Sequence, residues 1–263
     1  GARMALANDT RISPTAVVQA QLDAYNAHDV PALLAIYADD AQQFQHPDTL
    51  LATGSAKIGP RFTARFAASR PRAPVAILLH PHPQGGGTMN NSIVMAMYNT
   101  FVRRGFATLR FNFRGVGRSQ GTFDNGVGEL SDAASALDWM QQFNPEASTT
   151  WVGGFSFGAW IGMQLLMRRP EVRGFLSIAP PANMYDFTFL APCPSSGLIV
   201  DGGADEVVTG SSVQKLVDKL KTQRHITIDH ATIPGANHFF EHEMPDLMKV
   251  VDAYLDKRLS ADR

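Results

Sequence analysis

Serine, histidine and aspartate residues that could carry out nucleophilic catalysis follow apolar segments of the chain. Ser156 lies in Gly154-Phe155-Ser156-Phe157-Gly158, between an apolar segment of strand length and one of helical length. In that context the serine occupies a strained turn from which its hydroxyl projects, and the flanking glycines let strand and helix approach closely. The pattern predicts a serine nucleophile, with an incidental serine in a glycine-rich turn as the alternative.

A serine hydroxyl becomes a good nucleophile only when a base takes its proton and a carboxylate orients that base. Several acidic residues follow the apolar segment 197–200. We expect Asp205 to be the acid, because it lies in a turn beyond the strand, where open α/β sheets place their sites. Asp201 and Glu206 are the alternatives, and a turn-forming aspartate without a catalytic role is a further one.

The base is expected in the loop that follows the last apolar segment, where the chain reads Gly235-Ala236-Asn237-His238. We expect His238 to be the base, because Gly235 and the two phenylalanines after His238 define a tight loop with an apolar anchor. His230, inside the last strand pattern, and His242, one helical turn further on, are the alternatives. Each interval between the three expected residues has room for a strand and a helix.

Backbone N–H groups are expected to stabilise the negative charge that develops on the carbonyl oxygen in the transition state. One donor should be Phe157, the residue after the nucleophile. The second should come from the loop 80–87, in which two prolines lack an N–H. We expect His82 to be this donor, with Gln84 or one of the glycines 85–87 as alternatives.

The sequence predicts neither a cofactor nor a metal ion. His80 and His82 have the spacing of a ligand pair but no acidic or cysteine ligands beside them. The glycine-rich loop 113–121 matches neither phosphate-binding motif. We expect its Arg114 and Arg118 to hold loops together. The single cysteine, Cys193, rules out an intramolecular disulfide, and we expect it to be a buried thiol.

The elements that must position these residues are predicted by hydrophobic periodicity. Continuous apolar strands are expected at 75–80, 106–113, 149–155, 172–178, 197–200 and 225–233, as in a parallel sheet covered on both faces. Amphipathic helices are expected around 130–140, 213–220 and 247–255, with Ser211 or Ser212 as the N-cap of the second. The fold class is therefore α/β, with a mostly parallel central sheet, helices on both faces and a helical hairpin in residues 1–60.

Composition limits the classes of function. The 263 residues have a formal net charge of −1, with 44% hydrophobic and 18% charged residues. This balance is that of a globular chain, and it offers no general basic surface for nucleic acid or for an anionic membrane. No apolar run approaches the ~20 residues that span a bilayer. We expect a cytoplasmic protein without nucleic-acid or membrane partners.

Residues 62–260 resemble the α/β-hydrolase superfamily, and most closely its small cap-less members, the dienelactone hydrolases and bacterial serine esterases. The motifs that carry the resemblance are His80-Pro-His-Pro83, Arg114-Gly-x-Gly-x-Ser119, Gly154-x-Ser-x-Gly158 and Gly235-Ala-Asn-His238, together with Asp205. The resemblance implies a triad of Ser156, Asp205 and His238. Dienelactone hydrolases use a cysteine nucleophile, so Ser156 favours general ester chemistry. The stretch 180–195 is too short for a cap, and its Met184, Tyr185, Phe187 and Phe189 could line an acyl pocket.

Residues 15–66 resemble the start of a nuclear-transport-factor-2-like or ketosteroid-isomerase-like chain, through Tyr25-Asn-Ala-His-Asp29, Tyr37-Ala-Asp-Asp-Ala41 and Gly54-Ser-Ala-Lys-Ile58. The curved sheet of that fold is missing, so isomerase activity is not expected. We expect residues 1–60 to serve in packing or in a homodimer contact, beside a catalytic domain of residues 61–263. Residues 50–68 could supply antiparallel edge strands.

The sequence thus predicts a serine hydrolase that cleaves small-molecule carboxylic esters through an acyl-enzyme. An amidase, peptidase or thioesterase with the same triad is one alternative. A non-catalytic binding protein on a hydrolase fold is the other.

Overall fold

The computed structural model describes residues 49–52 and 61–261. By their internal contacts the residues form two compact units. Within the described residues, the first unit holds 49–52, 61–77 and 101–148, and the second holds 78–100 and 149–261. The expected hairpin and most of the expected boundary region near residue 60 lie outside the described residues.

The first unit is built on antiparallel strands and one long helix. Strands β1 (Thr49–Ala52), β2 (Arg61–Ala67), β4 (Ala107–Phe111) and the start of β3 (Val75–Leu79) follow the order β1-β2-β4-β3. Strand β2 pairs antiparallel with both β1 and β4, so the described part of 50–68 supplies antiparallel strands at this side of the sheet, as expected. Helix α4 (Val127–Phe143) packs on this sheet, with the Trp139 ring edge-on to Phe66 at 5.2 Å.

The second unit is a parallel sheet with the strand order β3-β5-β6-β7-β8. Its strands are the end of β3, then β5 (Thr150–Phe155), β6 (Val172–Ile178), β7 (Gly197–Gly202) and β8 (Ile228–Ile233). All residues of β5 and β7 are buried, which explains why these strands read as continuous apolar runs. The pairs β5–β6, β6–β7 and β7–β8 are all parallel.

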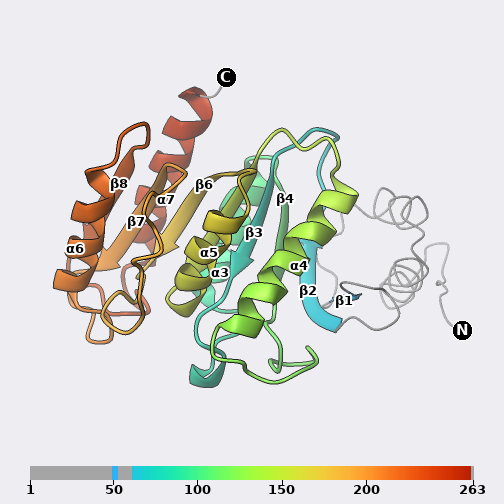
Figure 1. The fold of residues 1–263 in the computed structure, drawn as a ribbon, viewed down its shortest axis with the longest axis horizontal. Coiled ribbons are helices and arrows are strands. Elements are labelled where there is room, and N and C mark those ends of the chain that lie inside the picture. Colours follow the sequence, from blue (N-terminus) through green and yellow to red (C-terminus); the bar gives the residue numbers. More distant parts are fainter. Residues whose placement is uncertain (1–48, 53–60, 262–263) are drawn as a thin grey trace, which may run out of the picture. The chain divides into compact units, whose positions relative to one another are not determined.

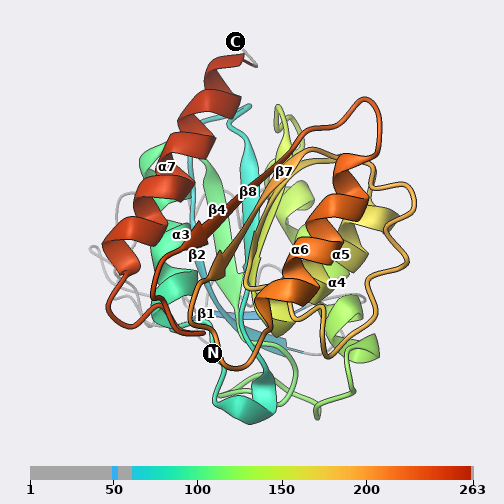
Figure 2. The ribbon, with the colours of Figure 1, turned by 90° about the vertical axis from the view of Figure 1, so that its left-hand side faces the viewer.

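Helices cover both faces of the parallel sheet (Figures 1 and 2). Helices α5 (Phe157–Arg168) and α6 (Gly210–Lys221) lie on one face, and α3 (Ser92–Arg103) and α7 (Met244–Ala261) lie on the other. The predicted α/β class, with a mostly parallel sheet and helices on both faces, is confirmed. The expected N-cap of α6 is wrong: Thr209, with extended backbone, precedes the helix, and Ser212 lies inside the first turn with its hydroxyl donating to the Thr209 carbonyl.

Helix α5 crosses the end of β3 at very close range. A Cβ atom at Gly158 would overlap the backbone carbonyl of Leu79, which no side-chain rotation can relieve. One turn later, a Cβ at Gly162 would lie 3.4 Å from a Val152 methyl group, close to ordinary contact. The close approach therefore depends on glycine at 158 and not at 162.

We expect Gly158→Ala to lower the free energy of unfolding by about 1–3 kcal/mol, because the added methyl group forces backbone apart. Gly162→Ala is the matched control and should leave stability unchanged or raise it by up to ~1 kcal/mol, since alanine favours a helix interior. Urea denaturation of the two variants measures this difference. Equal stability of both variants would contradict the close approach.

Candidate active site

Ser156 forms the turn that joins β5 to α5. Its φ is +57°, in the left-handed region that residues with a side chain rarely adopt. The Ser156 N–H donates to the Ile178 carbonyl at 2.8 Å, and the Ser156 carbonyl accepts from Ala159 at 2.8 Å. These bonds hold the strained turn between the end of β6 and the first turn of α5. The turn therefore has the geometry that the sequence motif predicted.

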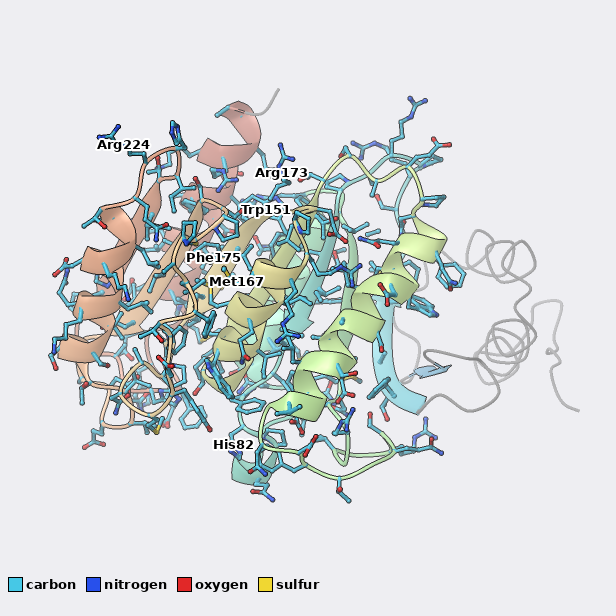
Figure 3. The ribbon with its side chains drawn as sticks, viewed as in Figure 1. His82, Trp151, Met167, Arg173, Phe175 and Arg224 are labelled. Atoms are coloured by element: carbon cyan, nitrogen blue, oxygen red, sulfur yellow. The ribbon has the colours of Figure 1, made fainter. Side chains whose placement is uncertain are left out.

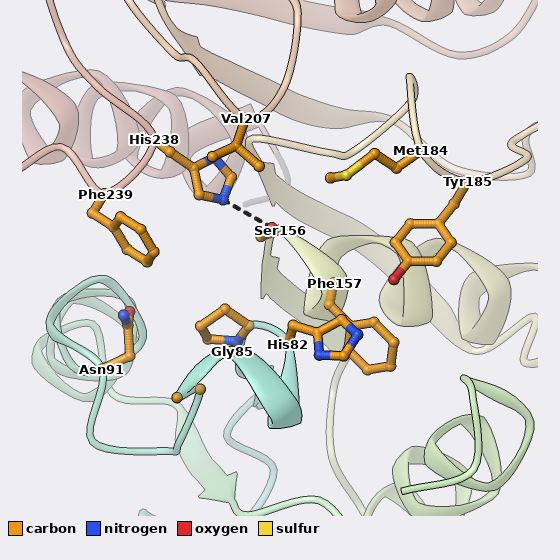
Figure 4. Close-up of a pocket in the computed structure, with 13 residues that line it drawn as sticks. His82, Gly85, Asn91, Ser156, Phe157, Met184, Tyr185, Val207, His238 and Phe239 are labelled. Carbon is orange, nitrogen blue, oxygen red and sulfur yellow. Dashed lines mark hydrogen bonds between the residues drawn. The ribbon is translucent and has the colours of Figure 1, made fainter.

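Two hydrogen bonds join Ser156 to an acid through an imidazole. His238 Nε2 lies 3.0 Å from Ser156 Oγ, and His238 Nδ1 lies 2.8 Å from Asp205 Oδ2. Because an ionised carboxylate only accepts, Nδ1 carries the hydrogen and Nε2 is the atom that faces the hydroxyl as an acceptor. The structure thus brings together the three residues that the sequence predicted as acid, base and nucleophile. Figure 4 shows the bond between His238 and Ser156.

The carboxylate of Asp205 is held in place by the loop after β7. Its other oxygen, Oδ1, accepts from the N–H groups of Val207 and Val208, each at 2.8 Å. Burial alone would raise the pKa of Asp205, but the hydrogen bonds from His238, Val208 and Val207 outweigh it and hold the pKa below its ordinary value. The acid is therefore ionised at neutral pH and oriented on both of its oxygens.

Aromatic rings fix the imidazole from two sides. The Phe155 ring lies 5.2 Å from the His238 ring, and the Phe239 ring meets it edge-on at 5.0 Å. The side chain of His238 is 7% exposed and that of Asp205 is 1% exposed. The pair is thus largely shielded from water.

The alternative residues do not reach the serine. His230 Nε2 bonds Asp201 Oδ1 at 2.9 Å, and the Thr232 hydroxyl donates to the same oxygen at 2.8 Å. These residues form a second acid–imidazole pair within β7 and β8. Glu206 and His242 are exposed, and within the described residues neither is hydrogen-bonded to Ser156.

The loop after β3 brings His82 beside the residue that follows the serine. The ring of His82 lies 5.1 Å from that of Phe157. Of the alternative donors, Gly85 and Gly87 donate their N–H groups to the His82 carbonyl, and Gln84 donates to His82 Nδ1. The N–H groups of three alternative donors, Gln84, Gly85 and Gly87, are therefore already bonded to His82, and these bonds shape the loop around it.

The Phe157 N–H belongs to the first turn of α5. N–H groups of a first helical turn have no acceptor within the helix. The two residues expected to supply the donors, Phe157 and His82, both line the cavity beside Ser156.

The cavity above Ser156 has a volume of about 210 Å³ and lies at the edge of the parallel sheet where its strands end. Figure 3 shows His82 at this edge, opposite Trp151 and Arg173 near the starts of β5 and β6. Met184, Val207 and Phe239 line the cavity and are 51%, 44% and 43% exposed.

The predicted acyl-pocket residues divide into two groups. Met184 and Tyr185 line the cavity, and the Tyr185 ring stacks on Trp160 at 4.2 Å. Phe187 and Phe189 are not among its lining residues and stack on each other at 5.9 Å. In the described chain the connection from β6 to β7 contains no helix or strand, so this connection supplies no helical cap.

Sequence reasoning missed three residues of the cavity, Asn91, Val207 and Phe239. Val207 and Phe239 follow the predicted acid and base within two residues, which is the signal that could have found them. Asn91 comes directly before α3. An asparagine before a helix predicts only an N-cap, so nothing in the sequence indicates that it lines a cavity.

The remaining motif residues have structural roles. Arg114 Nη2 and Nε bind Asp132 Oδ1 at 2.8 and 3.1 Å, which ties the loop after β4 to α4, as expected of this arginine. Cys193 is buried and its thiol donates to the Ser195 carbonyl at 3.4 Å. Burial raises the pKa of Cys193, so the thiol stays protonated.

His80 is fully buried beside the candidate site. Its Nδ1 donates to the Pro81 carbonyl at 2.7 Å. Burial lowers the pKa of His80 to about 4, although this hydrogen bond opposes the shift, so the imidazole is neutral at pH 7. Within 49–52 and 61–261, no three or more histidine, cysteine, aspartate or glutamate side chains gather as a metal site would require.

Comparison with known proteins defines the class of this fold and site. The sequence model of X-Pro dipeptidyl-peptidases (S15 family) matches residues 65–193. The structure of a protein of unknown function from Agrobacterium tumefaciens is 58% identical, with a TM-score of 0.78, and the match covers 82% of this chain and 97% of that one.

Two further structures show the family to which this chain belongs. An α/β serine hydrolase homologue from Coxiella burnetii is 33% identical, with a TM-score of 0.69 over 79% of this chain and 96% of that one. A member of the α/β serine hydrolases without lid from Xanthomonas campestris is 30% identical, with a TM-score of 0.69 over 80% and 94%. The fold is thus that of an α/β hydrolase. The chain belongs to the α/β serine hydrolases, in their form without a cap.

None of the helices in the described ranges combines the length and the apolar character that crossing a bilayer requires.

The buried His80 predicts an acid-sensitive step in stability. Between pH 6.5 and about 4 the unfolded chain binds a proton at His80 that the folded chain does not. The free energy of unfolding should therefore fall as the pH drops through this window, by on the order of 3 kcal/mol in total.

His80→Asn should flatten this dependence, because the asparagine amide can donate to Pro81 but does not titrate. Urea denaturation of both proteins between pH 7 and pH 4.5 measures the difference in slope. Identical slopes for the two proteins would contradict a neutral buried His80.

Proposed function

We propose that the protein cleaves carboxylic esters of small molecules through an acyl-enzyme formed on Ser156. The observation that supports this most directly is the continuous series of hydrogen bonds from Asp205 through His238 to Ser156, at 2.8 and 3.0 Å, beside an apolar cavity. A serine hydroxyl so placed has a base for its proton and an oriented partner for that base.

Acylation follows from the positions of these atoms. Ser156 Oγ attacks the ester carbonyl carbon, the carbonyl π electrons move to oxygen, and the hydroxyl proton passes to His238 Nε2. The negative oxygen accepts from the N–H groups of Phe157 and His82. When the bond from the carbonyl carbon to the alcohol oxygen breaks, His238 returns its proton to the leaving alcohol. Asp205 stays ionised and stabilises the imidazolium.

Deacylation repeats the same steps with water as the nucleophile. His238 takes a proton from the water, hydroxide adds to the acyl carbon, and the bond to Ser156 Oγ breaks as the proton returns to the serine. The products are the free acid and the alcohol.

A peptidase with the same three residues is the second candidate, because the X-Pro dipeptidyl-peptidase model matches residues 65–193. An enzyme that releases dipeptides must bind a free α-amino group, which is largely cationic at neutral pH. A buried cation needs a carboxylate partner, but no aspartate or glutamate of the described chain lines the cavity. This favours a neutral ester over a peptide.

One panel of substrates tests the choice. We expect turnover of 4-nitrophenyl butanoate and no detectable turnover of alanyl-prolyl-4-nitroanilide. Ser156→Ala should lower the ester kcat at least about 10³-fold and abolish fluorophosphonate labelling, because the members of such a group act as a unit. The matched control is Ser177→Ala, since Ser177 is a buried serine of β6 whose hydroxyl has no hydrogen-bond partner within the described ranges. Faster turnover of the anilide would establish the peptidase.

The two acid–imidazole pairs predict opposite outcomes for the same substitution. Asp205→Asn should lower kcat by about 10⁴-fold, because an amide that donates to Nδ1 leaves His238 in the wrong tautomer. Asp201→Asn should lower the melting temperature through its bonds to His230 and Thr232, and turnover should stay of the same order. Steady-state kinetics and thermal melting of both variants show which aspartate is the catalytic acid. If only Asp201→Asn lost turnover, Asp201 and not Asp205 would be the acid.

A further inference from the structure

Asn91 connects the cavity to helix α3. Its side-chain Oδ1 accepts from the N–H groups of Ile93 and Val94, at 2.9 and 3.2 Å, and its carbonyl accepts from Met95 at 2.9 Å. These are the bonds of an N-cap residue. Asn91 also lines the cavity above Ser156 (Figure 4).

The cap fixes which end of the amide is bound to the helix. Since Oδ1 receives two N–H donors, the opposite orientation would set NH₂ against N–H groups, so the NH₂ group must be the other end. Nδ2 has no hydrogen-bond partner among residues 49–52 and 61–261. Asn91 thus carries an amide NH₂ group whose two N–H bonds no described residue accepts.

The rest of the cavity is largely apolar. None of its lining residues in the described chain is an aspartate, glutamate, lysine or arginine. In Figure 4 the Asn91 side chain lies below Phe239, on the opposite side of Ser156 from Tyr185. A group that approaches Asn91 therefore meets an apolar ring and one uncharged donor.

We propose that Asn91 is a specificity-determining residue whose amide donates a hydrogen bond to an oxygen acceptor on the substrate. The substrate class is then a neutral ester with an apolar body and a second acceptor, a carbonyl or ether oxygen, apart from the scissile carbonyl. This inference rests on the proposed function. A site built to donate to such an oxygen disfavours the analogue without it, because the donor is then left unpaired.

The helix cap allows variants that separate the amide from its structural role. Asn91→Ser keeps a good N-cap and removes the amide, and Asn91→Asp keeps the cap but replaces the donor with an acceptor. Asn99→Ser is the matched control, since Asn99 is an exposed residue of the same helix and does not line the cavity. Melting temperatures check that the cap is retained.

Three pairs of esters of matched shape supply the readout, each with and without the acceptor. They are 4-nitrophenyl methoxyacetate and butanoate, 4-nitrophenyl 4-oxopentanoate and 4-methylpentanoate, and 2-methoxyethyl and butyl acetate. The measured quantity is the ratio of kcat/KM within a pair. Comparing this ratio between variants cancels the intrinsic reactivity of each ester.

In at least one pair, Asn91→Ser should lower the preference for the acceptor ester by about threefold to tenfold. Asn91→Asp should lower it further, because two acceptors repel, while Asn99→Ser leaves it unchanged. If all three ratios are the same in the unmodified protein and in both Asn91 variants, the role of Asn91 is refuted while the esterase stands. If no ester is turned over and fluorophosphonate does not label Ser156, the proposed function fails and this inference fails with it.

Discussion

The left-handed turn at Ser156 is the constraint on which the site depends. A residue with a side chain at φ +57° is strained, and it persists only where its surroundings fix it. Here β5 stays paired with β6 up to Phe155 and Ile178, and the Ser156 N–H continues that pairing to the Ile178 carbonyl. Helix α5 starts at the next residue, so the hydroxyl can point only to the edge where the strands end. The close contact of Gly158 with β3 completes this restraint.

The parallel pairing of β7 and β8 determines which side chains lie close to the Ser156 hydroxyl. Strands β7 and β8 run side by side, with Asp201 opposite Thr232 and Gly202 opposite Ile233. Their loops leave the sheet at one edge, and this places Asp205 and His238 together beyond the strands. The same register joins Asp201 to His230 inside the sheet. Two acid–imidazole pairs therefore arise from one topology, and only the pair in the loops reaches Ser156.

Much of the fold could be predicted from sequence, because strands buried on both faces are apolar throughout and the helices show one apolar stripe. The ends of two elements were predicted less accurately. Strand β8 begins at Ile228 and not at residue 225, and helix α6 begins at Gly210, before Ser211 and Ser212. The residues joined to Ser156 could be predicted because each follows a strand in a short, glycine-containing loop. Asn91 could not be assigned to the cavity, because a cap pattern fixes one end of an amide and only the fold decides what its other end faces. The expected N-terminal hairpin and dimer contact fall on residues outside the described ranges.

The short connection between β6 and β7 has a kinetic consequence. In the described chain no helix or strand of that connection closes over Ser156, and the apolar rim of Met184, Val207 and Phe239 is about half exposed. For the esterase proposed above, this connection imposes no opening step before substrate reaches the serine, so turnover should begin without a lag and without activation by an oil–water surface. Water would have the same access to the acyl-enzyme of that proposal, which favours release of a free acid over transfer of the acyl group to a second alcohol.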